Sequence, residues 1–194
     1  MMNRCASLFL GVAFLLCAPA SEAVERVSVC FNYGCLSQAE VEYSDGQLDE
    51  IRRLLAQPTS AAEEREVIAT VVGRLLGWAG QQSPIGADRG GNYADDAVYG
   101  RMDCIDHSTT TTRLLLLLEK RGWLRFHRVL EPAQRLRFVL FQHLSAQIEE
   151  LKPSVESQTQ EKFVVDSWFF DNGQPAVVMP LEAWMAGGGP SVGE

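Results

Sequence analysis

The chain has 194 residues, 46% of them hydrophobic and 22% charged, with a formal net charge of -8 at pH 7. This length is enough for one domain with a sizeable core and too short for two ordinary domains. Its few Lys and Arg residues are scattered, which argues against binding to nucleic acid, because phosphate contacts require clustered basic side chains.

Residues 1–23 have the pattern of a secretory signal peptide. Arg4 precedes an apolar run, and small residues follow that run up to Ala23. The run is about ten residues long, whereas a membrane-spanning helix requires ~20 residues. Lipidation of Cys17 is not expected, because Leu16 stands where lipoprotein signals have a small residue. We therefore predict an exported protein, periplasmic or extracellular, with no membrane span.

Three cysteines remain after removal of the signal peptide: Cys30, Cys35 and Cys104. Cys30 and Cys35 enclose the turn-forming sequence FNYG, which favours a local disulfide. A metal-ligand fragment and two unpaired thiols remain alternatives for this pair. The disulfide would leave Cys104 as a free thiol, as an odd cysteine count indicates.

Two amphipathic helices are predicted in the first half of the chain, after short β-like runs in residues 24–43. The first begins near Asp45 and is stopped by Pro58. The second has Thr59 or Ser60 as its N-cap and Glu63 at the capping-box position. Its apolar face consists of Val67, Val71, Leu75 and Trp78. We expect both helices to serve packing only.

Residues 81–102 form a long predicted loop that leads to Cys104. Its oxygen-bearing side chains could hold a hard cation, but their spacing differs from that of the twelve-residue Ca²⁺ loop. These side chains are Asp88, Asn92, Asp95 and Asp96. We expect a solvated loop and no metal site.

The helix after Cys104 is predicted to be central. Asp103 is a good N-cap, and Gly122 is a C-terminal stop signal. Leucines at residues 114–118 cover every side of the helix, which indicates burial all round. We expect this helix to pack on a sheet, with the two earlier helices flanking it.

Alternating patterns after residue 123 predict an antiparallel sheet of three or more strands. The strands are expected at residues 123–130, at residues 135–150 as one long strand, and at residues 161–173 ending in a turn. A short helical turn and a flexible tail at residues 187–194 close the chain. The predicted fold class is α+β, with a single domain over residues 24–186.

Cys104 is the candidate nucleophile. The N-terminus of a helix lowers the pKa of a thiol, whereas the neighbouring Asp103 and Asp106 raise it by charge repulsion. Activation therefore requires a histidine as base. His107 lies on the same helix and is poorly placed for this role, so we expect it to be structural, and His127 lies within a strand.

His143 and Asp166 are the candidate base and its orienting acid. His143 lies in the predicted long strand, and Asp166 lies between apolar residues of the next strand. A carboxylate in such an apolar strand is costly unless it is paired. Each residue also has a purely structural alternative: Cys104 as an inert buried cysteine, His143 as a core histidine and Asp166 as a turn-capping aspartate.

A cysteine at a helix start, followed by a histidine and an aspartate on adjacent strands, resembles the transglutaminase-like superfamily of papain-type cysteine enzymes. The resemblance covers about residues 86–172 and includes the segments GRMDCID, FQHLSAQIEE and FVVDSWFFDNG, which are also similar to exported, uncharacterised bacterial proteins. It implies that Cys104 is the acyl-accepting nucleophile, His143 its general base and Asp166 the residue that orients the imidazole.

The expected function is acyl transfer or amide hydrolysis on a protein or peptide substrate, without a cofactor. Hydrolysis is the default expectation, since no feature identifies an amine-binding pocket. Asn92 or Tyr93 could donate to the oxyanion beside the backbone N–H of Cys104. The alternative is a non-catalytic module on the same fold that binds an envelope protein partner.

Overall fold

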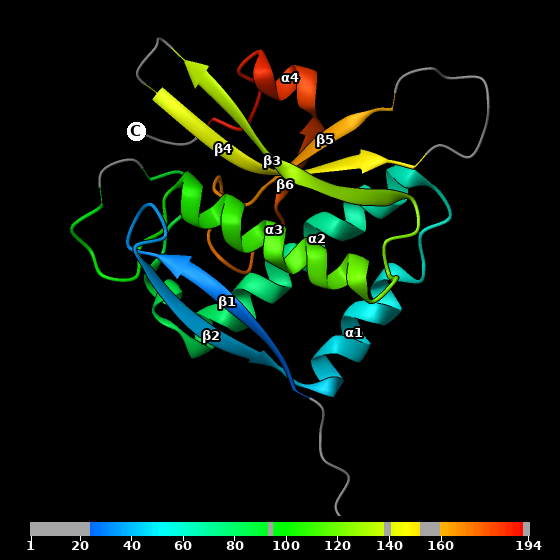
Figure 1. Cartoon of the computed structure of the whole chain (residues 1–194), viewed down its shortest axis with the longest axis horizontal. Helices are drawn as coiled ribbons and strands as arrows, with labels where there is room; N and C mark the ends of the chain where they lie inside the picture. The colour runs from blue at the N-terminus through cyan, green and yellow to red at the C-terminus, as the bar shows by residue number, and fades with distance from the viewer. Residues whose placement is uncertain (1–23, 93–94, 138–140, 152–159, 192–194) are drawn as a thin grey trace, which may run out of the picture.

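The computed structural model describes residues 24–92, 95–137, 141–151 and 160–191. The predicted signal peptide, residues 1–23, lies outside these ranges. The described chain contains both helices and antiparallel sheets, which confirms the α+β class (Figure 1). Its elements, in chain order, are β1 (Glu25–Phe31), β2 (Ser37–Tyr43), α1 (Asp45–Leu55), α2 (Ala61–Gln82), the 3₁₀ helix η1 (Pro84–Ala87), α3 (Cys104–Lys120), β3 (His127–Arg137), β4 (Phe141–Glu150), β5 (Lys162–Asp166), β6 (Val177–Pro180) and α4 (Leu181–Met185).

The first two helices begin where their capping residues predict. Ser44 caps α1 in a reciprocal capping box with Gln47. Ser60 caps α2, since its hydroxyl accepts the N–H of Glu63. Among the described residues, no helix is both long and apolar enough to cross a membrane.

Two antiparallel sheets are present in the described residues: the hairpin β1–β2, and a sheet in the order β3-β4-β5-β6. The prediction of one long strand at residues 135–150 is wrong. This stretch supplies the end of β3 and all of β4, and Arg137 pairs with Phe141. The apolar run contains no Gly, Pro, Asn or Asp to indicate a reversal. Residues 138–140 lie outside the described residues.

The predicted strand at residues 123–130 also needs correction. β3 begins only at His127 and continues through Glu131 and Pro132. The register with β4 shifts between Leu130 and Ala133. A bulge of this kind accommodates a proline, which has no N–H for the ladder.

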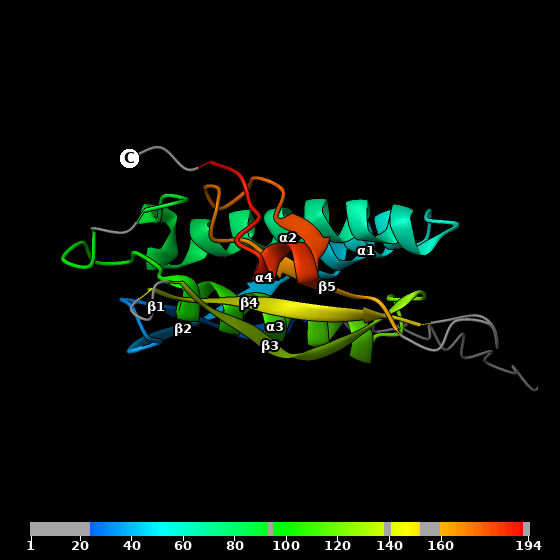
Figure 2. The ribbon, with the colours of Figure 1, turned by 90° about the horizontal axis from the view of Figure 1, so that it is seen from above.

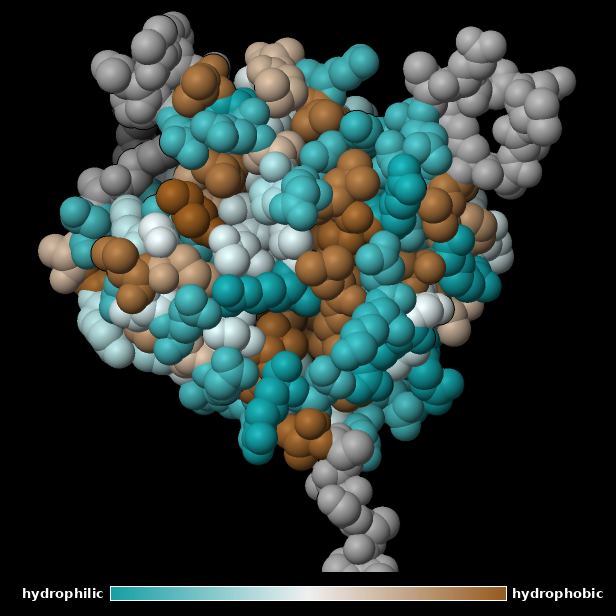
Figure 3. Space-filling view, in the orientation of Figure 1, coloured by the Kyte–Doolittle hydropathy of each residue, from teal (hydrophilic) through white to brown (hydrophobic). Residues whose placement is uncertain are grey.

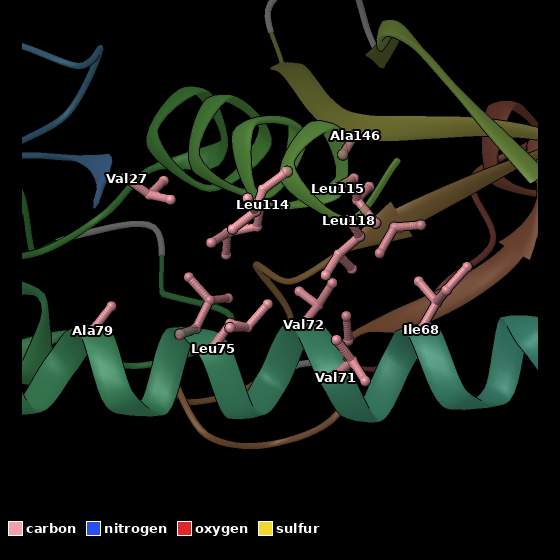
Figure 4. Close-up of a cluster of buried hydrophobic side chains, with 14 of the residues drawn as sticks. Val27, Ile68, Val71, Val72, Leu75, Ala79, Leu114, Leu115, Leu118 and Ala146 are labelled. Atoms are coloured by element: carbon pink, nitrogen blue, oxygen red, sulfur yellow. The ribbon is translucent and has the colours of Figure 1, made fainter. Parts of the chain in front are cut away.

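Helix α3 lies at the centre, between α2 and β4. Figure 4 shows Leu114, Leu115 and Leu118 directed towards α2, with Ala146 of β4 on the far side of α3. Figure 2 shows α1 and α2 on one side of the molecule and β3 and β4 on the other. The expectation that α3 is buried all round is wrong at one position, because Leu116 is 46% exposed.

Candidate active site

Cys104 lies at the first position of α3, and its sulfur faces the backbone of β4. Asp103 caps the helix by accepting the N–H groups of Ile105 and Asp106. The sulfur lies 3.8 Å from the carbonyl oxygen of Gln142, the residue before His143. The ladder between β4 and β5 extends only from Ala146 to Glu149, so the start of α3 contacts β4 beyond the end of that ladder.

His143 and Asp166 form a direct, largely buried pair. The Nε2 atom of His143 lies 2.7 Å from Oδ2 of Asp166, with side-chain exposures of 12% and 1%. Two further donors reach the carboxylate: the backbone N–H of Trp168 to Oδ1 at 3.2 Å and the indole N–H of Trp184 to Oδ2 at 2.9 Å. These bonds satisfy the buried carboxylate and leave Nδ1 of His143 for proton transfer.

Aromatic rings surround the imidazole of His143. The ring centroids of Trp168, Phe169 and Trp184 lie 5.1, 5.9 and 5.6 Å from that of His143. Arg135 in turn stacks on Trp184, with its guanidinium carbon 4.4 Å from the ring centroid. The packing fixes the orientation of the imidazole, as a proton-transferring group requires.

Cys104 and His143 both line one cavity of about 200 Å³. It is lined by Tyr33, Asn92, Asp103, Cys104, Gln142, His143 and Trp168. Asp166 lies behind His143 and is bonded to it. Cys104 and His143 thus share a cavity, and Asp166 is connected to it through His143.

Cys104 lies at a helix N-terminus, a position that lowers the pKa of a thiol, but the pKa of this thiol is raised. Burial raises the pKa of the thiol to about 11, and the charges of Asp103 and Asp166 act in the same direction. A hydrogen bond from the backbone of Leu144 lowers the pKa but does not compensate. The helix N-terminus therefore does not offset the effect of burial on the pKa of this thiol.

The other two histidines are buried in separate pairs. His107 bonds to Asp88 and to the hydroxyl of Ser167, each at 3.0 Å. His127 bonds to Glu64 of α2 at 2.7 Å. The expected structural role of His107 is thus explained by these two hydrogen bonds. We expected α2 to serve packing only, and this expectation did not include the buried bond from Glu64 to His127.

The loop before Cys104 is less solvated than expected. Asp88 is 2% exposed and also accepts the N–H of Met102. Asp95 is 9% exposed, accepts hydrogen bonds from Tyr33 and Asn92 and forms an ion pair with Arg101, whereas Asp96 is exposed as predicted. Asp88 and Asp95 can be buried because each of these carboxylates has several polar partners.

Asn92 and Tyr93 are the two candidate oxyanion donors predicted from the sequence. Asn92 lines the cavity, but its side-chain N–H donates to Asp95 at 2.9 Å. Tyr93 lies outside the described residues.

Cys30 and Cys35 form a disulfide, with their Cα atoms 4.7 Å apart, and Cys104 is free. In the described chain, these two sulfurs and Asp106 are the one cluster with metal-ligand proximity. Because both sulfurs belong to the disulfide, the cluster is not a ligand set for a metal.

Sequence reasoning missed four residues around the site: Tyr33, Gln142, Trp168 and Trp184. Gln142 and Trp168 had a local signal, because Gln142 directly precedes His143 and Trp168 lies two residues after Asp166. Trp184 reaches Asp166 from α4, and no spacing in the sequence indicates that contact.

Comparison of the chain with protein-family models, with curated proteins and with solved structures finds no match.

Proposed function

We propose that this protein is a cysteine enzyme of transglutaminase-like type, which performs acyl transfer or amide hydrolysis. The observation that carries the proposal is the 2.7 Å bond between His143 and Asp166, at the wall of the cavity that holds Cys104. A nucleophile, a base and a group that orients the base define this chemistry on many folds.

The reaction begins with a protonated thiol. As the sulfur of Cys104 attacks the substrate carbonyl, Nδ1 of His143 takes its proton, and Asp166 stabilises the resulting imidazolium. The imidazolium then protonates the leaving amine, and a thioester remains on Cys104. Water, or a second amine, attacks the thioester with His143 again as base.

One donor near the sulfur is assigned to the oxyanion. The N–H of Cys104 belongs to the first residue of α3, so no carbonyl within the helix can accept it. Gln142 also lines the cavity, but its carbonyl oxygen, 3.8 Å from the sulfur, is an acceptor and cannot serve this role. A fixed donor such as the N–H of Cys104 stabilises the developing charge of the tetrahedral intermediate.

A protein or peptide is the proposed substrate, and several exposed apolar residues support this assignment. Leu36, Tyr99 and Phe170 are 84%, 68% and 43% exposed and belong to the segments around the cavity. Leu136, 63% exposed, pairs across the sheet with Gln142 of the cavity wall. Figure 3 shows hydrophobic residues at the surface near the β1–β2 turn and the start of α3.

The disulfide between Cys30 and Cys35 is compatible with the proposed export.

The first test is acylation by p-nitrophenyl acetate. We expect the wild-type protein to release nitrophenolate and to carry an acetyl group on the peptide that contains Cys104. His143→Ala should slow this acylation by about 10²–10⁴-fold, which is the range for loss of a general base.

Labelling of Cys104 in denaturant serves as the control, because both proteins should then react equally. Absence of acetylation in the folded wild type, or an equal rate in His143→Ala, would contradict the proposed enzyme. Either result would favour the binding module.

A further inference from the structure

The turn between β1 and β2 has an unusual backbone. Asn32, Tyr33, Gly34 and Cys35 have φ angles of 64°, 63°, 65° and 57°. Three of these four residues carry a Cβ atom, which disfavours the left-handed region. Such a run persists only where its surroundings hold it in place.

The surroundings that hold this turn are two carboxylates beside Cys104. The N–H groups of Tyr33 and Cys35 donate to Asp106 at 2.8 and 2.6 Å. The N–H of Gly34 donates to Asp103 at 3.0 Å. Three consecutive N–H groups thus form a nest, a concave arrangement of backbone donors that binds anions. Its anions are carboxylates of the chain itself.

The carboxylates of Asp103 and Asp106 depend on the N–H groups of the nest for compensation of their charge. Asp106 is fully buried, and burial raises the pKa of its carboxyl to about 6, whereas its backbone hydrogen bonds, including that from Cys35, act in the opposite direction. Asp103 lies next to Cys104 in the sequence, and its charge acts directly on the sulfur. Without the nest, both charges would be less compensated, and the less compensated charge of Asp103 would make formation of a thiolate on Cys104 harder.

The disulfide closes the turn and thereby holds the nest against α3. Cys30 is anchored at the end of β1, where its N–H donates to the hydroxyl of Thr110 at 2.9 Å. The bond to Cys35 ties the other end of the turn to this anchored residue. Figure 1 shows the β1–β2 turn and the start of α3 on the same side of the molecule.

We infer that the disulfide-closed turn is a positioning element of the active site, and that Cys104 reacts efficiently only while Cys30 and Cys35 are oxidised. The turn compensates the charges of Asp103 and Asp106 and places Tyr33 in the cavity wall. Reduction by a dithiol would transfer two electrons and two protons to the cysteine pair, and the dithiol would become a disulfide. The inference rests on the proposed function.

The charged and titratable groups facing Cys104 come from four elements. They are Asp103 at the N-cap of α3, His143 of β4, Asp166 at the end of β5, and Tyr33 of the turn. Of the two carboxylates among them, only Asp103 accepts an N–H group of the nest. Opening the disulfide therefore changes the electrostatic environment of the sulfur through Asp103, and leaves the pair of His143 and Asp166 in place.

The test measures the pH profile of Cys104 alkylation by iodoacetamide in the full chain. The double variant Cys30→Ser/Cys35→Ser is compared with wild type, with mass spectrometry of the Cys104 peptide as the readout. We expect the profile of the variant to shift to higher pH, and alkylation at neutral pH to be about tenfold slower. Arg26→Ala, an exposed change in β1, is the matched control and should keep the wild-type profile.

An unchanged profile in a folded double variant would overturn the inference. If the variant does not fold, wild type reduced with dithiothreitol and freed of reductant gives the same measurement. Unfolding of that protein as well would also overturn it, because the disulfide would then hold the fold rather than the site. Failure of the proposed function is seen separately, as absence of p-nitrophenyl acetate acylation in oxidised wild type.

Discussion

At the scale of single residues, access to a cavity distinguishes the three histidines. Each one bonds to a carboxylate, so pairing alone does not identify a catalytic base. The side chain of His107 is 1% exposed and that of His127 is fully buried, whereas His143 is 12% exposed and lines the cavity with Cys104. Of the three histidines, His143 is the one that shares a cavity with a free thiol.

Asp166→Asn tests the role of the acid. The amide has nearly the shape of the carboxylate, but its NH₂ group would select the wrong tautomer of His143. We expect acylation of Cys104 by p-nitrophenyl acetate to slow by about 10²–10⁴-fold. Asp171→Asn, an exposed neighbour whose Oδ1 can still accept the N–H of Gly90, should keep the wild-type rate. Equal rates for the two variants would remove Asp166 from the mechanism.

At the scale of elements, α3 connects the core to the site. Leu114, Leu115 and Leu118 are directed towards α2, while Thr110 bonds to β1 and Thr111 to Ser167. Ser167 directly follows Asp166, so the same helix supports both Cys104 and the strand end that carries Asp166. Two of the poor helix formers in α3, Thr110 and Thr111, are therefore explained by tertiary hydrogen bonds.

Leu115→Ala and Leu116→Ala test this arrangement on adjacent positions. Leu115 is fully buried, so we expect its truncation to lower the free energy of unfolding by about 2–5 kcal/mol. Leu116 is 46% exposed, and its truncation should change the free energy by less than about 0.5 kcal/mol. Urea unfolding gives both values. Similar losses in the two variants would contradict the assigned buried face.

At the scale of the whole molecule, Glu64 links α2 to the segment that begins β3. It accepts the N–H groups of Arg125 and Phe126 at 2.7 and 2.9 Å, in addition to the bond with His127. Burial by itself raises the pKa of this carboxyl, but these hydrogen bonds outweigh burial and lower it overall. Glu64 thus joins the helical layer to the sheet through a buried charge.

The lowered pKa of Glu64 fixes the sign of its pH dependence. A group with a folded-state pKa below the unfolded value of 4.5 stabilises the fold above that pH, and this contribution disappears as pH falls. We expect Glu64→Gln to lower the free energy of unfolding at neutral pH by about 1–3 kcal/mol. The difference from wild type should shrink as acid protonates Glu64.

Urea unfolding at neutral and acidic pH measures this difference. Glu66→Gln, an exposed change on the same helix, is the control and should match wild type at both pH values. A difference that persists unchanged in acid would mean that shape, and not charge, makes Glu64 important.

Parts of the site were predictable because their signals are local. Asp103 followed by Cys104 indicates a helix cap, and the buried acid Asp166 is conspicuous in an apolar strand. The raised pKa of Cys104 was not predictable, because it depends on how much of the sulfur β4 covers. The contact of Trp184 with Asp166 was equally hidden, since the two residues meet only when α4 packs on the sheet.

The sequence by itself determined the α+β class, the starts of the helices and the cysteine turn, because capping, periodicity and turn chemistry act between residues a few positions apart. Only the tertiary structure decided where the chain reverses between β3 and β4, which leucine of α3 faces solvent, and which carboxylates the turn at residues 32–35 binds. The physical reason is that burial and hydrogen-bond partners are set by segments distant in the chain, and burial in turn sets the pKa of the thiol.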